Sequence, residues 1–281
     1  YAGFRGLSRK CAIIFARLLE KSPGLRYNIK CIFLLTDDNK GDKQVFKGPL
    51  IEIIQLIFKS NRTNWDIISV VLSLFSVLII LFVIFPLRNC GRGLVAKLLG
   101  DDTPERSGML TLNPIAHLDL IGALAMLVCR IGWTKPMPID IRRCTKVSQK
   151  KAVVLVSLAG PVANILLAYV LTIIYKIVML SAGADNMTAV YISLGLLYTI
   201  QISVFLAVFN LVPIPPFDGF NVLACFLPGK AVYFMQKNQQ IFYWVFFALL
   251  IFGVLDVPLG AATNGIIWLL EKASFFIPAA I

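Results

Sequence analysis

The stretch NLVPIPPFDG, residues 210–219, follows a long apolar run, and its interpretation decides the fold. Its prolines interrupt a helix, because proline donates no backbone hydrogen bond and its ring clashes with the preceding turn. In lipid, such a break is tolerated only where protein or enclosed water satisfies the freed backbone groups. An acidic residue at the break is costly there and is a functional-site candidate by default. We therefore predict that Asp218 faces a protein-lined site.

The composition of the whole chain is that of an integral membrane protein. Hydrophobic residues make up 58% of the 281 residues and charged residues only 15%, whereas soluble domains have roughly 45–50% and about 25%. A membrane-spanning helix needs about 20 apolar residues. Apolar runs occupy 67–87, 152–175, 188–212, 241–255 and 257–270, with a shorter one at 120–129. We predict an all-α, polytopic integral membrane protein with four to six membrane segments in the lipid bilayer.

The formal net charge of +12 does not indicate a nucleic-acid partner, because the basic residues gather in loops instead of an aromatic-rich patch. The 133–151 loop carries six Lys and Arg against one acid. Cytoplasmic loops of membrane proteins are enriched in this way. The pattern predicts a cytoplasmic N-terminus, cytoplasmic loops at 133–151 and 220–240, and no nucleic-acid binding.

Residues 1–65 differ from the rest of the chain and carry twelve Lys and Arg against five acids. The segments CAIIFARLLEK (11–21) and GPLIEIIQLIF (48–58) have apolar residues at helical spacing. We predict a basic peripheral extension over 1–65, either amphipathic or poorly ordered, followed by a transmembrane domain over 66–281.

Four segments in the same order resemble the site-2 protease family of intramembrane zinc metalloproteases, in its compact bacterial branch. They are NLVPIPPFDG, SLAGPVANILLA (157–168), GMLTLNPIAHLDLIG (108–122) and GWTKPMPID (132–140). The resemblance implies a site-2 protease core in a bacterial cytoplasmic (inner) membrane, with Asp218 at the position of the third zinc ligand. It also marks substrate-contact or structural positions at Asn210, Pro213, Pro215, Pro216, Gly219, Gly160, Pro161, Asn164 and His117.

The chain departs from the family at its H-E-x-x-H motif, in which two His bind Zn²⁺ from one helix face and the Glu activates water. Arg88-Asn89-Cys90-Gly91-Arg92 occupies this position. Arginine has no lone pair to offer a metal, and the asparagine amide cannot accept a proton as a carboxylate does. We therefore predict no cofactor and no peptide hydrolysis, although zinc is the cofactor of the family.

One other zinc site is conceivable, formed by Cys90, His117 and Asp218. It lacks the paired His geometry and an obvious general base. His117 is the only histidine in the chain, and it and Asp119 are expected to anchor the short segment 118–130.

Arg88 and Arg92 are four residues apart and share one face of a helix. One hypothesis is that one or both guanidinium groups replace the metal as the positive partner of Asp218. The alternative is that 86–99 lies at the membrane surface, where these side chains extend to water. The span count leaves open how Arg92 and Asp218 reach the same depth.

The other marked positions have structural alternatives. Gly160, Pro161 and Asn164 either pack and hydrogen-bond beside the site, since small residues let helices approach closely, or form a local kink. Asn210 either contacts substrate or satisfies carbonyl groups freed by Pro213.

Three functions are compatible with the sequence. The first is a catalytically inactive homologue, a pseudoprotease, that binds a transmembrane helix of a substrate or partner protein. The second is an active intramembrane zinc metalloprotease of which this sequence is an altered copy. The third is a small transporter or channel that uses Arg88, Arg92 and Asp218 as an intramembrane charge site.

Overall fold

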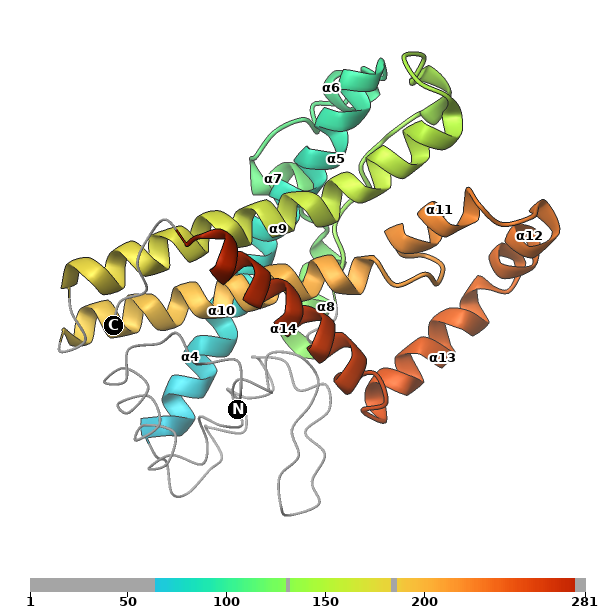
Figure 1. Ribbon diagram of the computed structural model, residues 1–281. Helices are drawn as coiled ribbons and strands as arrows, with labels where there is room; N and C mark the ends of the chain where they lie inside the picture. Colours follow the sequence, from blue (N-terminus) through green and yellow to red (C-terminus); the bar gives the residue numbers. More distant parts are fainter. Residues whose placement is uncertain (1–63, 130–131, 183–185, 276–281) are drawn as a thin grey trace.

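The computed structural model describes residues 64–129, 132–182 and 186–275, and the regular elements in these ranges are helical (Figure 1). An isolated bridge joins Leu118 to Thr134. The longer helices are α4 (Asn64–Ile79), α5 (Phe85–Leu99), α8 (Leu120–Cys129), α9 (Gln149–Ala182), α10 (Met187–Asn210), α13 (Gln239–Ile251) and α14 (Asp256–Ala273). The shorter elements are a π-helical segment Ile80–Ile84, α6 (Thr103–Arg106), α7 (Pro114–His117), a 3₁₀ turn Ile141–Arg143, α11 (Asp218–Ala224) and α12 (Gly229–Lys237).

Three of these helical stretches are long and apolar enough to cross a membrane, namely Leu74–Leu99, Gln149–Ser181 and Tyr191–Asn210. Gln239–Leu250 is apolar but shorter. The all-α prediction is confirmed. The apolar runs at 241–255 and 257–270 fall on α13, of 13 residues, and α14, of 18 residues, which a turn with φ of +72° at Gly253 separates, and neither helix is among the three candidate spans of the described residues.

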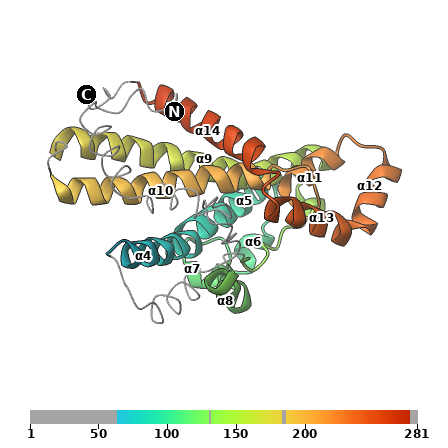
Figure 2. The same ribbon diagram turned by 90° about the horizontal axis from the view of Figure 1, so that it is seen from below.

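The centre of the fold is the pair α9 and α10, which lie side by side in both views (Figures 1 and 2). Helix α5 packs against α9, and α14 packs against α10. Helix α9 continues through Pro161, and the Asn186 side chain caps α10 by accepting from the backbone N–H groups of Thr188 and Ala189. The two long helices therefore form the wall on which the other elements are placed.

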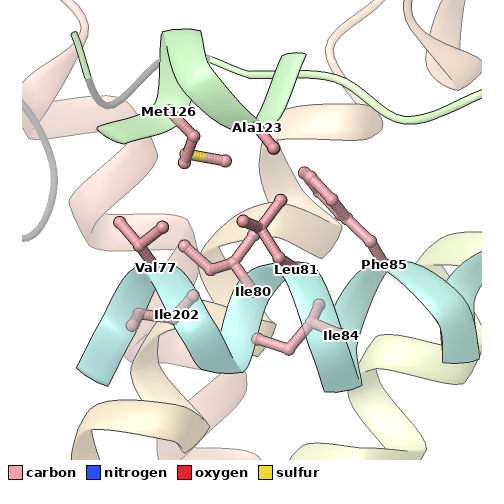
Figure 3. Packing of buried hydrophobic residues seen from close by; sticks show 8 residues of the cluster. All are labelled: Val77, Ile80, Leu81, Ile84, Phe85, Ala123, Met126 and Ile202. Carbon is pink, nitrogen blue, oxygen red and sulfur yellow. The ribbon is translucent and has the colours of Figure 1, made fainter. Parts of the chain in front are cut away.

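A hydrophobic cluster fixes the α4–α5 arm against its neighbours (Figure 3). Its members come from α4, the π-helical segment, α5, α8 and α10, and they are Val77, Ile80, Leu81, Ile84, Phe85, Ala123, Met126 and Ile202. Burying such side chains stabilises the fold by about 1.5–3 kcal/mol each. The cluster lies directly before residues 88–92, so it sets the position of the second half of this arm.

Helix α5 continues from α4 and has a clear stop signal. Pro86 lies inside this continuous helix, directly after the π-helical segment Ile80–Ile84, where its missing N–H removes one backbone hydrogen bond. The helix ends at Gly100, whose φ of +114° is a left-handed conformation that glycine adopts without strain. Residues 85–99 are therefore one continuous helix joined to α4, within the stretch Leu74–Leu99 that is long and apolar enough to cross a membrane.

The predicted basic extension, 1–65, lies almost wholly outside the described residues, which begin at Asn64. Its two predicted amphipathic segments, 11–21 and 48–58, are outside them as well. The extension and its boundary therefore remain predictions.

Candidate functional site

Helix α5 presents Arg88 and Arg92 on one face, one turn apart, toward α9 and the start of α11. Gly160 of α9 makes this approach possible. A Cβ atom there would lie 3.0 Å from the Arg88 Cγ and 3.3 Å from the Arg92 Cδ. The missing side chain therefore leaves the room in which the two arginines lie.

Asp218 is the first residue of α11 and receives both arginines. The Arg88 Nη2 donates a hydrogen bond of 2.7 Å to Asp218 Oδ2 and another of 2.9 Å to Asn210 Oδ1. The Arg92 Nη2 lies 3.6 Å from Asp218 Oδ1, close enough for an ion pair and too far for a hydrogen bond. The pairing hypothesis is confirmed, with Arg88 as the principal partner.

The exposed fractions separate this pair from a surface contact. The Asp218 side chain is 5% exposed, that of Arg88 16% and that of Arg92 23%. Water-facing ion pairs commonly contribute about 0–1 kcal/mol, whereas removing one partner of a buried pair costs about 3–5 kcal/mol. Most of each arginine side chain is buried, and the loop after α10 brings Asp218 back to α5.

Three phenylalanines hold the loop that carries Asp218. The ring of Phe209 lies 4.8 Å from that of Phe217 and 5.5 Å from that of Phe246, centroid to centroid. The Phe217 and Phe246 rings are 5.0 Å apart. Edge-to-face contacts of this kind add about 0.5–1.5 kcal/mol per pair to the burial of the rings. The residues on both sides of the proline break are therefore fixed to α13.

Asn89, which follows Arg88 on α5, belongs with His117 to a neighbouring buried cluster. The Asn89 Nδ2 donates to the Thr134 Oγ1 at 3.1 Å and lies 3.5 Å from the His117 Nδ1. The His117 Nε2 lies 2.7 Å from the carbonyl oxygen of Thr111, which can only accept, so Nε2 carries the proton. Both ring nitrogens of His117 are thus engaged. The cluster ties α5 to the 108–135 segment, as expected for an anchoring histidine.

The two marked asparagines differ from expectation. Asn210 satisfies no carbonyl freed by Pro213; its Nδ2 donates to the Leu206 carbonyl within α10, and its Oδ1 accepts from Arg88. Asn164 is fully buried, but its side-chain oxygen and nitrogen have no hydrogen-bond partner among the described residues. Its backbone carbonyl accepts from the Ser203 Oγ at 2.8 Å, so it joins α9 to α10 through the main chain.

The sequence analysis missed Asp101, which is fully buried directly after α5. It accepts hydrogen bonds from the Thr103 N–H and hydroxyl and from the Asp140 N–H. Burial acts to raise the pKa of Asp101, but these hydrogen bonds and the Arg143 charge outweigh it, and the pKa is lowered. The signal available in the sequence was an Asp two residues before a Thr-Pro helix start.

Gly219 fixes the place of Asp218, and replacing it is expected to be severe. A Cβ on Gly219 would lie 2.1 Å from the Leu211 carbonyl oxygen and 2.4 Å from the Leu211 carbonyl carbon, both backbone atoms. We expect Gly219→Ala to lower the free energy of unfolding by about 3 kcal/mol, the upper part of the range for overpacking, measured by SDS titration in mixed micelles. Gly265→Ala is the matched control, because a Cβ there meets nothing within 4 Å on helix α14.

The control should be neutral or stabilising by up to about 1 kcal/mol, because alanine favours a helix over glycine. Equal effects of the two substitutions would contradict the role given to Gly219.

The residues gathered at the site do not fit a zinc ion. Structural and catalytic zinc sites use Cys, His, Asp or Glu side chains at tetrahedral positions. Asp218 is the only such ligand among the site residues, and its carboxylate is already held by a guanidinium. Across the described ranges, no three His, Cys, Asp or Glu side chains are grouped to hold a metal, so the set Cys90, His117 and Asp218 is not assembled.

Comparison with known proteins relates the chain to one family of membrane peptidases. Residues 174–253 match the model of peptidase family M50, a stretch that includes Asn210 and Asp218 and begins after residues 88–92. The chain is 35% identical over 193 residues to "Putative zinc metalloprotease YwhC" of Bacillus subtilis (strain 168), covering 68% of this chain and 84% of that protein.

A second relative is "Putative zinc metalloprotease Rip2" of Mycolicibacterium smegmatis. It is 32% identical over 141 residues, or 49% of this chain and 51% of that protein. Solved structures gave no significant match.

These matches correct one prediction. The expectation that no cofactor is involved is wrong, because the matched family is a peptidase family and the names of both relatives include zinc metalloprotease, which indicates Zn²⁺. Arg88 and Arg92, which face Asp218, nevertheless have no lone pair to offer a metal. The family's cofactor and the residues present at this site therefore disagree.

Proposed function

The protein belongs to peptidase family M50, the site-2 protease family of integral membrane proteins, and from this premise we propose that it is a pseudoprotease. It binds a transmembrane segment of another protein without cutting it. The observation that carries the proposal is the 2.7 Å contact between the Arg88 guanidinium and Asp218. This contact joins Arg88, at the position of the first His in the family motif, to Asp218, at the position of the third zinc ligand. Helices α5, α9 and α10 remain packed around it.

Loss of hydrolysis follows from the side chains present. A general base must accept a proton, and the residue at the position of the family's Glu is Asn89, whose amide donates to Thr134. Arginine stays protonated in proteins, so neither Arg88 nor Arg92 replaces that base. The chemistry of these three side chains supports binding and gives no route to peptide hydrolysis.

Retention of binding is supported by the scaffold. The long helices α9 and α10 pack closely, and the broken segment 211–217 still brings Asp218 to α5. Helix α9 also carries an exposed apolar row at a four-residue spacing, with Val162, Leu166 and Val170 each about half exposed. Such a row contacts either lipid or the helix of a partner.

We further propose the orientation that the loop charges predict, with the N-terminus and the 133–151 loop in the cytoplasm of a bacterium. Cysteine labelling of a Ser148→Cys variant from one side of the membrane tests this orientation. Labelling from the outer side would contradict it.

The function is tested with the full chain in phosphatidylcholine nanodiscs and a set of transmembrane peptides. We expect at least one peptide to bind with a dissociation constant in the micromolar range, typical of modest interfaces, and to remain uncut by mass spectrometry after prolonged incubation with Zn²⁺. The Bacillus subtilis relative, treated in the same way, is the comparison for cleavage. Cleavage by this protein would contradict the proposal, as would failure to bind any peptide that the relative binds.

A further inference from the structure

The arginine–aspartate site carries one positive charge more than it neutralises. Arg88 and Arg92 contribute two guanidinium groups, and Asp218 contributes one carboxylate. Arg88 uses that carboxylate and also Asn210. Arg92 is left with a 3.6 Å contact and no hydrogen bond to Asp218.

The neighbouring elements supply no second carboxylate for Arg92. Helix α10 has no charged residue, the charges of α9 are all lysines, and α11 has Asp218 alone. The acids beyond the end of α5 have other partners. Glu105 accepts from Lys97 at 2.7 Å, and Asp102 pairs with Arg106 and Arg143.

The Arg92 side chain is mostly buried yet reachable. Its Nε is buried without a hydrogen-bond partner among the described residues, while the side chain as a whole is 23% exposed. Arginine keeps its proton in proteins, so this guanidinium needs an anion or water. Its planar set of donors matches a carboxylate or phosphate in bidentate geometry.

The position of Arg92 favours a carboxylate from a membrane-spanning segment. Arg92 precedes the end of α5 at Leu99 by seven residues, or about 10 Å of helix at 1.5 Å per residue. Arg92 lies within Leu74–Leu99, which is long and apolar enough to cross a membrane, and an Asp or Glu of a neighbouring transmembrane helix can lie at the same level. The membrane makes such an unpaired acid costly, which a guanidinium partner relieves.

We propose that Arg92 is an oxyanion-recognition residue that selects transmembrane segments carrying an Asp or Glu at the depth of the site. The proposal rests on the proposed function and names the chemistry of the partner. The Arg88–Asp218 pair holds α5 against the start of α11, and the Arg92 guanidinium supplies the positive charge that binds the carboxylate. Arg92, which cannot bind a metal, would thus bind the carboxylate of the partner helix.

The test compares two transmembrane peptides that differ only in one Asp or Asn at mid-depth, bound to the full chain in phosphatidylcholine nanodiscs. We expect the wild-type protein to bind the Asp peptide about tenfold more tightly, as hydrogen bonds to charged groups allow. Arg92→Gln should remove this preference, and Arg92→Lys should keep part of it because the charge remains without the planar fork.

Lys97→Gln is the matched control, since it removes a positive charge from the same helix at an exposed pair with Glu105. It should leave the tenfold preference unchanged. Thermal unfolding of each variant shows whether it is folded. Arg92→Gln should fold, because it removes a charge that has no full partner.

The outcomes are separable from those of the proposed function. Equal binding of both peptides to the wild-type protein would overturn the oxyanion proposal and leave transmembrane-segment binding intact. Stabilisation by anionic phosphatidylglycerol in place of zwitterionic phosphatidylcholine, lost in Arg92→Gln and without any Asp preference, would assign the site to an anionic lipid and overturn the carboxylate proposal.

If neither peptide binds, the proposed function fails. The oxyanion proposal is then tested separately, by the effect of acetate on thermal unfolding. Acetate should then raise the unfolding temperature of the wild-type protein relative to chloride at equal ionic strength, and not that of Arg92→Gln. No difference between the two salts would overturn it.

Discussion

Asp218→Ala is expected to lower the free energy of unfolding by about 3–5 kcal/mol, the range found when one partner of a buried ion pair is removed. The substitution leaves Arg88 and Arg92 facing each other at a mostly buried site without the carboxylate that holds them. The measurement is SDS-induced unfolding of the purified protein in mixed micelles. Asp256→Ala on α14, distant in sequence from the arginine pair, is a comparison of the same chemical change.

Double-mutant cycles with leucine replacements separate the two arginines. The Arg88–Asp218 cycle should give a coupling energy of more than about 1 kcal/mol, because the pair shares a hydrogen bond of 2.7 Å. The Arg92–Asp218 cycle should give a smaller value, because its contact is 3.6 Å long. Coupling that is larger for Arg92, or absent from both cycles, would contradict the assignment of Arg88 as principal partner.

Arg88→His with Arg92→His is expected to create a site for about one zinc ion per chain. Both positions already face Asp218 from one side of α5, so two imidazoles and one carboxylate would meet there. Metal content of the purified variant is measured by atomic emission. The same variant with Asp218→Ala is the control, and it should hold far less zinc because one of the three ligands is gone.

Adding Asn89→Glu supplies the carboxylate that a general base requires. We expect this triple variant to cut a transmembrane peptide that the unaltered protein only binds, with products identified by mass spectrometry. Equal zinc content in the double-histidine variant and its Asp218→Ala control would show that residues 88, 92 and 218 do not converge as described.

Much of the fold followed from the sequence because hydrophobic length and proline breaks are local signals. The run at 152–175 lies within α9, α10 covers the run at 188–212 as far as Asn210, and the NLVPIPPFDG break separates α10 from α11. The number of full-length spans was harder to predict. The turn at Gly253 divides an apolar stretch into two shorter helices, and composition does not show which glycine adopts a left-handed turn.

The candidate site was predictable in part. A four-residue spacing places Arg88 and Arg92 on one face of a helix whatever the fold, and the resemblance indicated Asp218 as their partner. The sequence could not predict that Asp218 forms a hydrogen bond with Arg88 and only a longer ion pair with Arg92, because this depends on where α11 begins relative to α5. The second bond of Arg88, to Asn210, and the cluster of Asn89 with His117 likewise join residues far apart in the chain.

The Arg88 guanidinium bonds the last residue of α10 and the first residue of α11, which has a consequence for the history of the protein. A single Arg88→His change leaves Asp218 without its hydrogen-bonded partner and gains only one of two imidazoles. A change that begins at Arg88 therefore passes through a less stable protein, and folded proteins have only about 5–15 kcal/mol of stability to lose. The two hydrogen bonds of Arg88 therefore oppose the single substitution Arg88→His, whether or not a second histidine follows.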